Sequence, residues 1–219
     1  MLEAMDAFFE ARLEGYDAHM LRDIEGAEEF YPFTASLLPD APAAVLDLGC
    51  GTGLELEYYI RRCPEVQVTG IDLSAAMLAA LRAKFPGRRL ELLRGSYLEL
   101  PLGTEAYDAA VSVESLHHFP AERKLELYRR LLEALKTGGF FVLTDYFAAD
   151  DEEERLYFAE LDRLRQSEGH PEDALLHYDT PLTEAHERAL LLEAGFSPVE
   201  VLRRWGATST LLARRPAAE

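Results

Sequence analysis

The stretch "VLDLGCGTGLELEYY" (residues 45–59) runs from apolar residues through an acid and three glycines into a segment that can continue as a helix. It begins within "AAVLDL" (43–48), an apolar run of strand length that is typical of a strand buried on both faces of a parallel sheet. Gly49, Gly51 and Gly53 permit positive φ angles and a close approach of the backbone to a ligand. Glycine-rich strand-to-helix turns also form for folding reasons alone, so the glycines do not by themselves define a site.

Strands and helices alternate on the C-terminal side of this turn. The apolar runs predict strands at 43–48, 66–71, 89–93, 107–113 and 140–145, with helices between them. Such alternation is typical of right-handed βαβ units. It predicts an α/β, doubly wound Rossmann-like fold. Two further runs, 198–205 and 207–214, predict a hairpin at Gly206 whose second strand lies antiparallel at the end of a seven-stranded, mostly parallel sheet.

The length of 219 residues favours one domain with a large core. Within it we expect an N-terminal helical lid (1–40), a cofactor-binding core (41–147), a substrate cap (148–182) and a final helix with the hairpin (183–219). The lid is predicted to open with one amphipathic helix up to Tyr16, followed by a second helical segment near 25–38 that is broken or bent at Pro32.

Composition limits the partners and the compartment. A formal charge of −18 repels polyphosphates, which makes nucleic acids and anionic membranes unlikely partners. The chain shows neither a secretory signal nor an apolar run long enough to span a bilayer, so we expect a cytoplasmic protein. Cys50 and Cys63 form no CxxC pair, and no metal cluster is visible in the sequence. A homodimer is left open.

Two acidic residues indicate which chemical groups the ligand carries. The pattern Asp47-x-Gly49-x-Gly51-x-Gly53 differs from the G-x-G-x-x-G fingerprint of dinucleotide sites. A carboxylate at Asp47 would repel a pyrophosphate and attract an ammonium group. Asp72 ends the next strand, at the position from which a carboxylate accepts two ribose hydroxyls. Together they predict a ligand with a ribose and a positive amine, and they disfavour the alternative of a nicotinamide-dependent oxidoreductase.

Five motifs carry a family resemblance: "VLDLGCGTG", "VTGIDLS", "LRGSYLELP", "YDAAVSVESLHHF" and "LLEALKTGGFFVLTDY". With them the chain resembles a class I S-adenosylmethionine-dependent methyltransferase of the small-molecule type, from about residue 40 to its end. The resemblance implies S-adenosyl-L-methionine as cofactor and methyl transfer to a small-molecule acceptor by in-line displacement. A non-catalytic cofactor-binding regulator is an alternative.

The segment "TEAHERALLLEAGF" also resembles the ending of wobble-uridine tRNA carboxymethyltransferases. This distant resemblance makes a tRNA-modifying enzyme a further alternative. The chain lacks an arginine at the place where those enzymes are expected to use one for a carboxylated cofactor, and the acidic net charge argues against tRNA.

The resemblance also implies which residues bind the cofactor. The methionine part is expected against Gly49, Cys50 and Gly51, with Asp47 near its ammonium group. Asp72 is expected to hold the ribose, and Leu73 and Met77 to pack on the adenine. Ser96 stands where the family usually has an acid for the adenine amine, so Ser96 and Tyr97 are the candidates there. Glu114 is expected to face the same crevice.

Candidate catalytic residues are His117 and Tyr16. A histidine can accept a proton from a nucleophile at neutral pH, although His117 could equally pack under the cofactor. Tyr16 lies in "GYDAHM", which resembles a segment that approaches the cofactor in related enzymes. Neighbouring side chains usually point apart, so we expect no more than one of His117 and His118 to face the substrate.

Tyr31, His118 and Tyr146 are the residues expected to contact the acceptor. The segment "LHYDTPLT" (176–183) could bring His177 and Tyr178 to the pocket, but a solvated loop is the favoured interpretation. The sequence leaves open which acceptor is used and whether methylation is directed to oxygen, nitrogen, sulfur or carbon.

Overall fold

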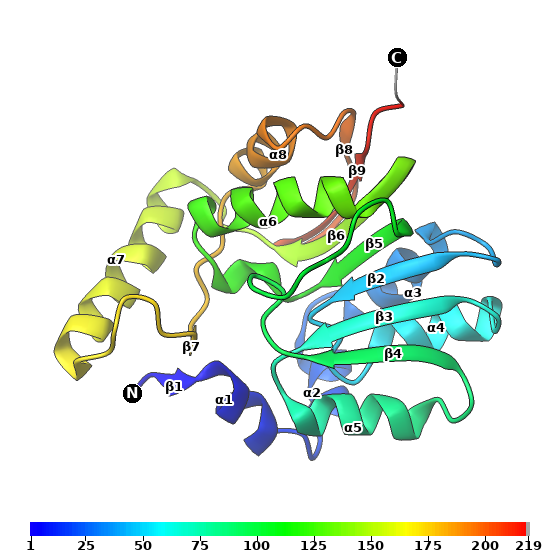
Figure 1. Cartoon of the computed structure of the whole chain (residues 1–219). Helices are drawn as coiled ribbons and strands as arrows, with labels where there is room; N and C mark the ends of the chain where they lie inside the picture. Colours follow the sequence, from blue (N-terminus) through cyan, green and yellow to red (C-terminus); the bar gives the residue numbers. More distant parts are fainter. Residues whose placement is uncertain (218–219) are drawn as a thin grey trace.

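A computed structural model describes residues 1–217 as a seven-stranded sheet between two layers of helices (Figure 1). The strand order is β4-β3-β2-β5-β6-β9-β8. The strands are β2 (Ala44–Leu48), β3 (Gln67–Asp72), β4 (Arg89–Arg94), β5 (Tyr107–Val113), β6 (Leu135–Tyr146), β8 (Val199–Trp205) and β9 (Thr208–Arg214). Strands β2 to β6 pair in parallel, and β9 is antiparallel to both of its neighbours. The predicted fold class is therefore confirmed.

The place predicted for the last strand was wrong. β9 lies between β6 and β8, so β8 forms the edge of the sheet. All residues of β9 except Arg214 are buried, whereas the middle of β8 is exposed and carries Arg203 and Arg204. An edge strand tolerates charged side chains that an interior strand cannot bury, which explains the order.

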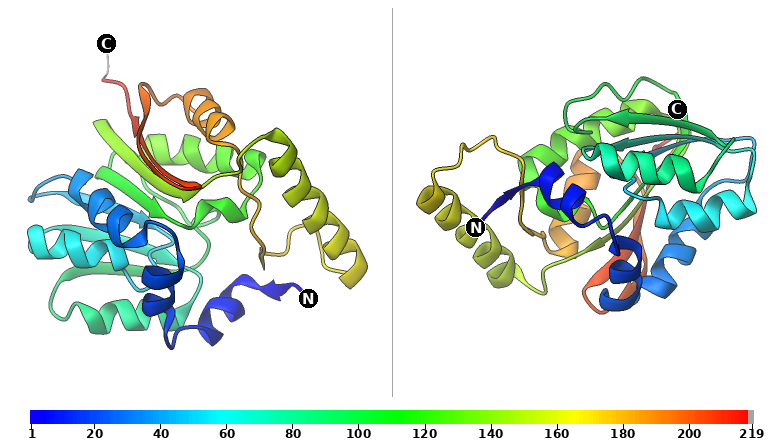
Figure 2. Two further views of the ribbon diagram at one scale, coloured as in Figure 1. Left: turned by 180° about the vertical axis from the view of Figure 1, so that it is seen from behind. Right: turned by 90° about the horizontal axis from the view of Figure 1, so that it is seen from below.

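Helices cover both faces of the sheet (Figures 1 and 2). On one side are α3 (Ala27–Leu37), α4 (Leu54–Arg62) and α5 (Ala75–Lys84); on the other are α6 (Ala121–Ala134) and α8 (Glu184–Glu193). Val45 and Leu46 are adjacent in β2 and fully buried, yet they belong to different core clusters. A strand covered on both faces has this pattern, as its continuous apolar run predicts.

The N-terminal segment departs from the expected single helix. α1 (Met5–Ala11) ends before Gly15, whose φ of 84° starts α2 (Tyr16–Asp23) in a new direction. No break occurs at Pro32, which lies inside α3. Phe30 and Thr34 on either side of it are fully buried, and this packing offsets the hydrogen bond that proline cannot make.

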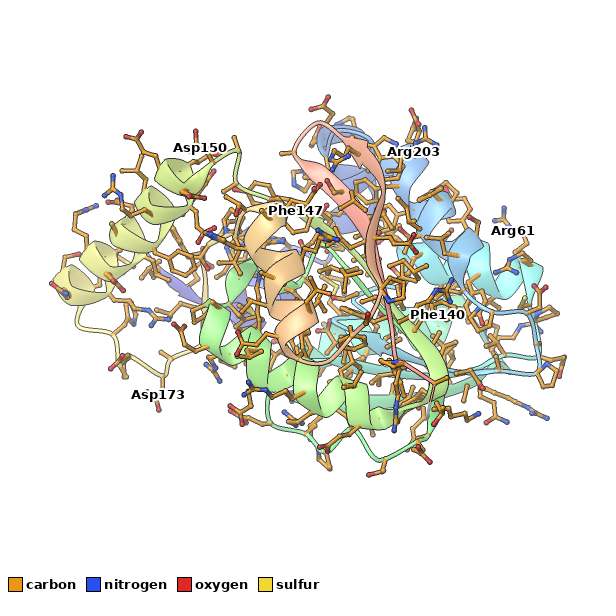
Figure 3. All side chains as sticks on the ribbon, turned by 90° about the horizontal axis from the view of Figure 1, so that it is seen from above. Arg61, Phe140, Phe147, Asp150, Asp173 and Arg203 are labelled. Atoms are coloured by element: carbon orange, nitrogen blue, oxygen red, sulfur yellow. The ribbon has the colours of Figure 1, made fainter. Side chains whose placement is uncertain are left out.

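The segment after β6 lies at one side of the molecule. It contains α7 (Asp151–Glu168), whose first turn is capped by the Asp150 side chain, and the short strand β7 (Leu176–His177). In Figure 3, Asp150 before α7 and Asp173 between α7 and β7 lie on the opposite side of the molecule from Arg61. β7 pairs antiparallel with β1 (Glu3–Ala4), a contact that no local pattern predicts. Over residues 1–217, no helix is long and apolar enough to cross a membrane.

Candidate functional site

The glycine turn after β2 is fixed by Asp72. Its Oδ2 accepts a hydrogen bond from the Gly51 N–H at 2.9 Å, and its Oδ1 accepts one from the Ser74 N–H at 2.8 Å. Gly49 and Gly51 have φ angles of 75° and 46°. A Cβ atom on Gly51 would meet no atom within 4 Å, so the backbone there borders open space that a ligand can approach.

A narrow cofactor cleft lies at this edge of the sheet, beyond the ends of β2, β3 and β5. Its walls include most of the predicted cofactor-binding residues: Gly49, Gly51, Asp72, Leu73, Met77, Ser96, Tyr97 and Glu114. Sequence reasoning did not assign Met5, Val113, Ser115 and Phe119 to the site, although the last three lie within the quoted motif "YDAAVSVESLHHF". Tyr97 is held there because its hydroxyl lies 2.9 Å from the Ser115 Oγ.

Two predicted cofactor residues lie outside the cleft wall. The Cys50 side chain is buried beneath Gly70, where a Cβ would come within 2.8 Å of its sulfur, so only the Cys50 backbone can face the cleft. Asp47 is 1% exposed. Within the described residues, Asp47 Oδ2 and Glu55 Oε1 are buried oxygens without a hydrogen-bond partner.

Asp47 and Glu55 form a buried pair of acids. Burial, followed by the negative charge of Glu55, raises the pKa of Asp47 well above its usual value. Burial also raises the pKa of Glu55. The pair therefore retains a proton. Its two unpaired oxygens would be stabilised by a cationic group such as an ammonium.

We expect Asp47→Asn to stabilise the ligand-free protein at neutral pH. Because the folded pKa values are raised, the folded state binds more protons than the unfolded state, and stability falls as pH rises above about 4. An amide at position 47 donates to Glu55 without needing a proton, so the free energy of unfolding should change less with pH than in the wild type.

Urea unfolding at several pH values between about 5 and 8 measures this difference. Asp108→Asn is the control. The Asp108 carboxylate accepts from the Ala44 N–H and pairs with Lys136, contacts that outweigh burial and lower its pKa, so its loss should destabilise instead. Identical pH dependence in Asp47→Asn and the wild type would contradict a shared proton.

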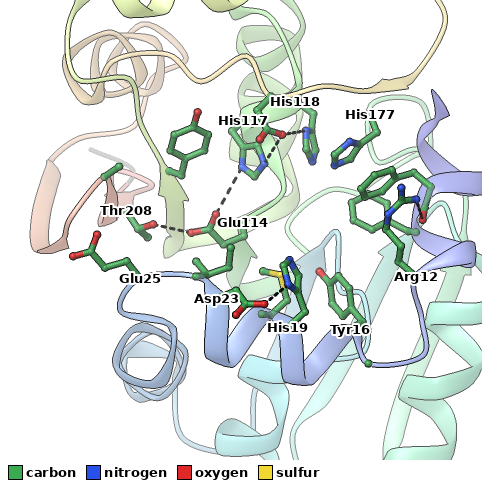
Figure 4. A pocket seen from close by; sticks show the side chains of 18 of the residues that line it. Arg12, Tyr16, His19, Asp23, Glu25, Glu114, His117, His118, His177 and Thr208 are labelled. Atoms are coloured by element: carbon green, nitrogen blue, oxygen red, sulfur yellow. Dashed lines mark hydrogen bonds and ion pairs between the residues drawn. The ribbon is translucent and has the colours of Figure 1, made fainter. Parts of the chain in front are cut away.

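An adjoining cavity of about 800 Å³ is large enough for a small-molecule acceptor (Figure 4). Its walls come from α1 and α2, the β5–α6 connection, the loop after β7 and the β8–β9 hairpin. Phe9, Tyr16, Glu114 and His118 line both the cavity and the cofactor cleft. The two spaces therefore meet at a common wall.

Glu114 occupies the junction of the two spaces. Its φ of 49° is left-handed, a conformation that costs energy for a residue other than glycine and that clusters at functional sites. Its Oε1 accepts a hydrogen bond from the Thr208 hydroxyl at 3.0 Å. Burial, followed by the charge of Asp145, raises its pKa to about 8, so it is largely protonated at neutral pH.

Both adjacent histidines line the cavity, contrary to the expectation that only one would face the substrate. They lie in a 3₁₀ turn, η1 (Leu116–His118), where successive side chains are about 120° apart. Their ring centroids are 4.1 Å apart. Consecutive residues in such a turn can share one wall, which alternating strand geometry would prevent.

The two histidines differ in protonation. Burial alone would lower the pKa of His117, but the charge and the 2.5 Å hydrogen bond of Asp145 outweigh it and raise the pKa to about 9. Burial and the neighbouring charge of His117 lower the pKa of His118. His117 is thus protonated at neutral pH and is no proton acceptor in that state, whereas His118 is neutral.

Not all of the residues predicted to contact the acceptor line the cavity. Tyr146 lines the cavity, 5.3 Å from His117 between ring centroids. Tyr31 does not belong to the cavity wall: it is 3% exposed and packs on Phe30 in the core. The helical face that carries Tyr31 is apolar and turns to the sheet, which corrects the expected contact with the acceptor.

The segment "LHYDTPLT" is not a solvated loop throughout. His177 stacks on Phe8 with ring centroids 3.4 Å apart and lines the cavity. Asp179 also lines it, with its Oδ1 3.2 Å from the His118 Nδ1. Tyr178 is absent from the cavity wall. The pairing of β1 with β7 and the 2.7 Å hydrogen bond from the Thr180 N–H to the His117 carbonyl hold this segment at the site, and a local sequence pattern gives little sign of either contact.

The cavity is acidic. Its acids are Glu14, Asp23, Glu25, Glu114 and Asp179; Glu114 is largely protonated, and the protonated His117 offsets part of the remaining negative charge. Within residues 1–217, Arg12 is the only lysine or arginine on the wall, and it pairs with Glu3 at 3.1 Å. Such a surface favours a neutral or cationic molecule over a carboxylate.

Comparison with known proteins agrees with the fold and the cleft. Residues 45–139 match the methyltransferase domain family. The chain is 29% identical to a carboxy-S-adenosyl-L-methionine synthase of Campylobacter curvus, over 82% of this chain and 80% of that protein. A trans-aconitate 2-methyltransferase of Rhodopseudomonas palustris is 35% identical over 46% of this chain and 37% of its own length. The crystal structure of an S-adenosylmethionine-dependent methyltransferase from Mesorhizobium loti superimposes with a TM-score of 0.62 at 21% identity, covering 84% of this chain and 96% of that one.

The fold is Rossmann-like, with a cleft at the glycine turn and Asp72, beyond the carboxyl ends of the strands, where open α/β sheets bind ligands. The matched domain at 45–139, the relatives and the shared fold support a class I S-adenosylmethionine-dependent methyltransferase with S-adenosylmethionine as cofactor.

Proposed function

We propose that the enzyme methylates a neutral or cationic small molecule bound in the acidic cavity. The observation that carries this proposal is the wall shared by the cofactor cleft and the cavity, formed by Phe9, Tyr16, Glu114 and His118. S-adenosylmethionine supplies a methyl group on a sulfonium centre. The protein's contribution is alignment, and holding two reactants in line is worth about 7–11 kcal/mol.

The chain offers a partner for each part of the cofactor. In this proposal Gly49 and Gly51 border the methionine part, Asp72 accepts from the ribose and Met77 packs on the adenine. Asp47 and Glu55 lie outside the cleft wall, and their buried, unpaired oxygens would attract the cationic amino group through charge.

The cleft is closed in this structure. It has about 50 Å³ of free volume, far below the roughly 300–1,000 Å³ of ligand pockets. Met5, Phe9 and Tyr16 from the N-terminal segment form part of its wall. The proposal therefore requires α1 and α2 to move when the cofactor enters.

Tyr16 acts in this proposal as a neutral hydroxyl near the sulfonium. Burial, followed by the negative charges of Asp72 and Glu55, raises its pKa well above the usual value. Tyr16 therefore keeps its proton and orients the reactants, with no role as a base.

The test is a methyl-transfer assay with labelled S-adenosylmethionine and a panel of amines, phenols, alcohols and carboxylic acids of similar size. We expect turnover with cationic and neutral acceptors. Carboxylic acids should give the lowest turnover. Turnover confined to carboxylic acids would contradict the charge argument. Calorimetry with S-adenosylhomocysteine checks cofactor binding separately.

A second candidate is carboxy-S-adenosyl-L-methionine synthesis, which the relative from Campylobacter curvus favours by matching over most of both chains. The single arginine of the cavity wall, already paired with Glu3, argues against binding of an added carboxylate. Mass spectrometry of the nucleoside released from purified protein distinguishes the two candidates, since this product carries one additional carboxyl group.

We also propose that nucleic acid is not the substrate. The basic residues at the end of the sheet are engaged, since Arg203 pairs with Glu29, Arg204 with Glu184 and Arg215 with Glu105. A gel shift with tRNA at low salt tests this, because phosphate binding is strongest there.

A further inference from the structure

We propose that His117, His118 and Asp179 bind one divalent transition-metal ion in the wall of the acceptor cavity. One ligand atom from each residue lies within 4.8 Å of the other two. Two imidazoles and one carboxylate form a recurrent metal site that leaves coordination positions open to a substrate. Imidazole ligands favour zinc, iron, cobalt or nickel over magnesium and calcium.

The two distances from Asp179 to the histidine nitrogens suit a metal ion. Nitrogen and oxygen ligands lie about 2.0–2.2 Å from zinc, so two ligands at a tetrahedral angle are roughly 3.3–3.6 Å apart. Asp179 Oδ1 lies 3.2 Å from His118 Nδ1 and 3.6 Å from His117 Nε2. Small side-chain movements would therefore complete the site without a change in the backbone.

A buried carboxylate holds His117 in the required orientation. Asp145, 1% exposed, binds His117 Nδ1 through Oδ1 at 2.5 Å. Its oxygens also accept from the N–H groups of Leu116 and Tyr146, at 2.8 and 3.0 Å. This leaves His117 Nε2 facing Asp179. A carboxylate behind a ligating histidine is the usual second layer of a metal site, and it makes Asp145 a positioning residue.

The surroundings favour a cation. The site opens into the acidic cavity, where His177 lies beside it with its ring centroid 5.0 Å from that of His118. His117 presents Nδ1 to Asp145 and Nε2 to Asp179, so a cation bound at Nε2 lies close to two carboxylates. A divalent ion there would neutralise part of their negative charge.

The ion would activate the acceptor, a role that rests on the proposed function, although binding of the ion does not. An acceptor hydroxyl coordinated to the metal has a lowered pKa and loses its proton to solvent. A lone pair on that oxygen then forms the bond to the methyl carbon, and the carbon–sulfur bond breaks with its electron pair remaining on sulfur.

The experiment titrates the chelator-treated 219-residue protein with Co²⁺, followed by displacement with Zn²⁺. We expect one Co²⁺ per chain and visible absorption from a site with nitrogen ligands. Asp179→Asn and His117→Gln should each lower the affinity at least about tenfold, and Asp145→Asn by about 10- to 100-fold with the stoichiometry retained.

His186→Ala is the matched control. His186 lies near two acids, with its Nδ1 2.9 Å from Glu154 and its Nε2 3.9 Å from Asp151, but it is about half exposed and lies outside the cavity wall. It should leave Co²⁺ binding unchanged. The proposal is overturned by a wild type that binds no Co²⁺, or by equal binding in the His117→Gln/Asp179→Asn double variant.

Calorimetry with S-adenosylhomocysteine separates this proposal from the proposed function. Asp179 lies outside the cofactor cleft and its side chain is 45% exposed, so Asp179→Asn should fold and bind S-adenosylhomocysteine like the wild type. If the wild type binds S-adenosylhomocysteine normally but binds no metal, only the metal-site proposal is refuted. If it binds metal but no S-adenosylhomocysteine, only the proposed function is refuted.

Discussion

Asp72→Ala is expected to weaken S-adenosylhomocysteine binding by at least about a hundredfold. Hydrogen bonds to a charged group are worth about 1.5–3 kcal/mol each, and the proposal assigns two ribose hydroxyls to this carboxylate. Their loss removes at least about 3 kcal/mol, which corresponds to that factor in the dissociation constant. The variant also removes the 2.9 Å hydrogen bond that the Gly51 N–H donates to Asp72, so the conformation of the glycine turn is less well fixed. Calorimetry measures the effect.

Asp108→Ala is the matched control for Asp72→Ala. Asp108 also accepts from a backbone N–H, that of Ala44 at 2.8 Å, and it lies outside both the cleft and the cavity. Its removal should lower stability and leave the dissociation constant for S-adenosylhomocysteine unchanged. Equal losses of affinity in both variants would show that the effect is a general loss of stability. An unchanged affinity in Asp72→Ala would refute the assigned ribose contact.

Glu187→Leu is expected to destabilise the fold by about 3–5 kcal/mol. Glu187 joins α8 to α6: its Oε2 lies 2.6 Å from the Lys124 Nζ, and its Oε1 accepts from the Tyr128 hydroxyl. Glu187 and Lys124 are each 1% exposed. Removing one partner of a buried pair leaves the other charge without compensation, and this accounts for the large cost. Urea unfolding measures it.

The double variant Lys124→Met/Glu187→Leu should recover most of this loss. Replacing both charges with apolar side chains of similar volume removes the unpaired ammonium group, and such replacements are often neutral or stabilising. A double variant no more stable than Glu187→Leu would instead assign the loss to the Tyr128 hydrogen bond or to poor packing. Arg129→Ala, from the exposed pair with Glu193, should change stability little.

The strand-to-helix turn, and the position of Asp72 at the end of the next strand, could be predicted from the sequence. The apolar run at 43–48, the glycines and the acid at the end of the next strand are local patterns, and the parallel sheet places their carboxyl ends at one edge. Tyr16 and Glu114 were identified as well, and they line both spaces.

Other residues were misplaced for physical reasons. Tyr31 lies on the buried face of α3, and a single helix has no local signal that separates a core tyrosine from one at a pocket. His117 and His118 share a wall because the loop forms a 3₁₀ turn. The raised pKa of His117 depends on Asp145, which is 28 residues away in sequence.

The sequence by itself determined the alternation of strands and helices, the glycine turn and the family resemblance, because each depends on residues that are close along the chain. Only the tertiary structure decided how the cavity is formed. β1 and β7 are separated by about 170 residues, yet they pair, and the Thr180 N–H donates to the His117 carbonyl, so that Asp179 and His177 lie beside His118. Contacts between such distant segments depend on how whole elements pack, and this packing made the histidines and Asp179 into one site.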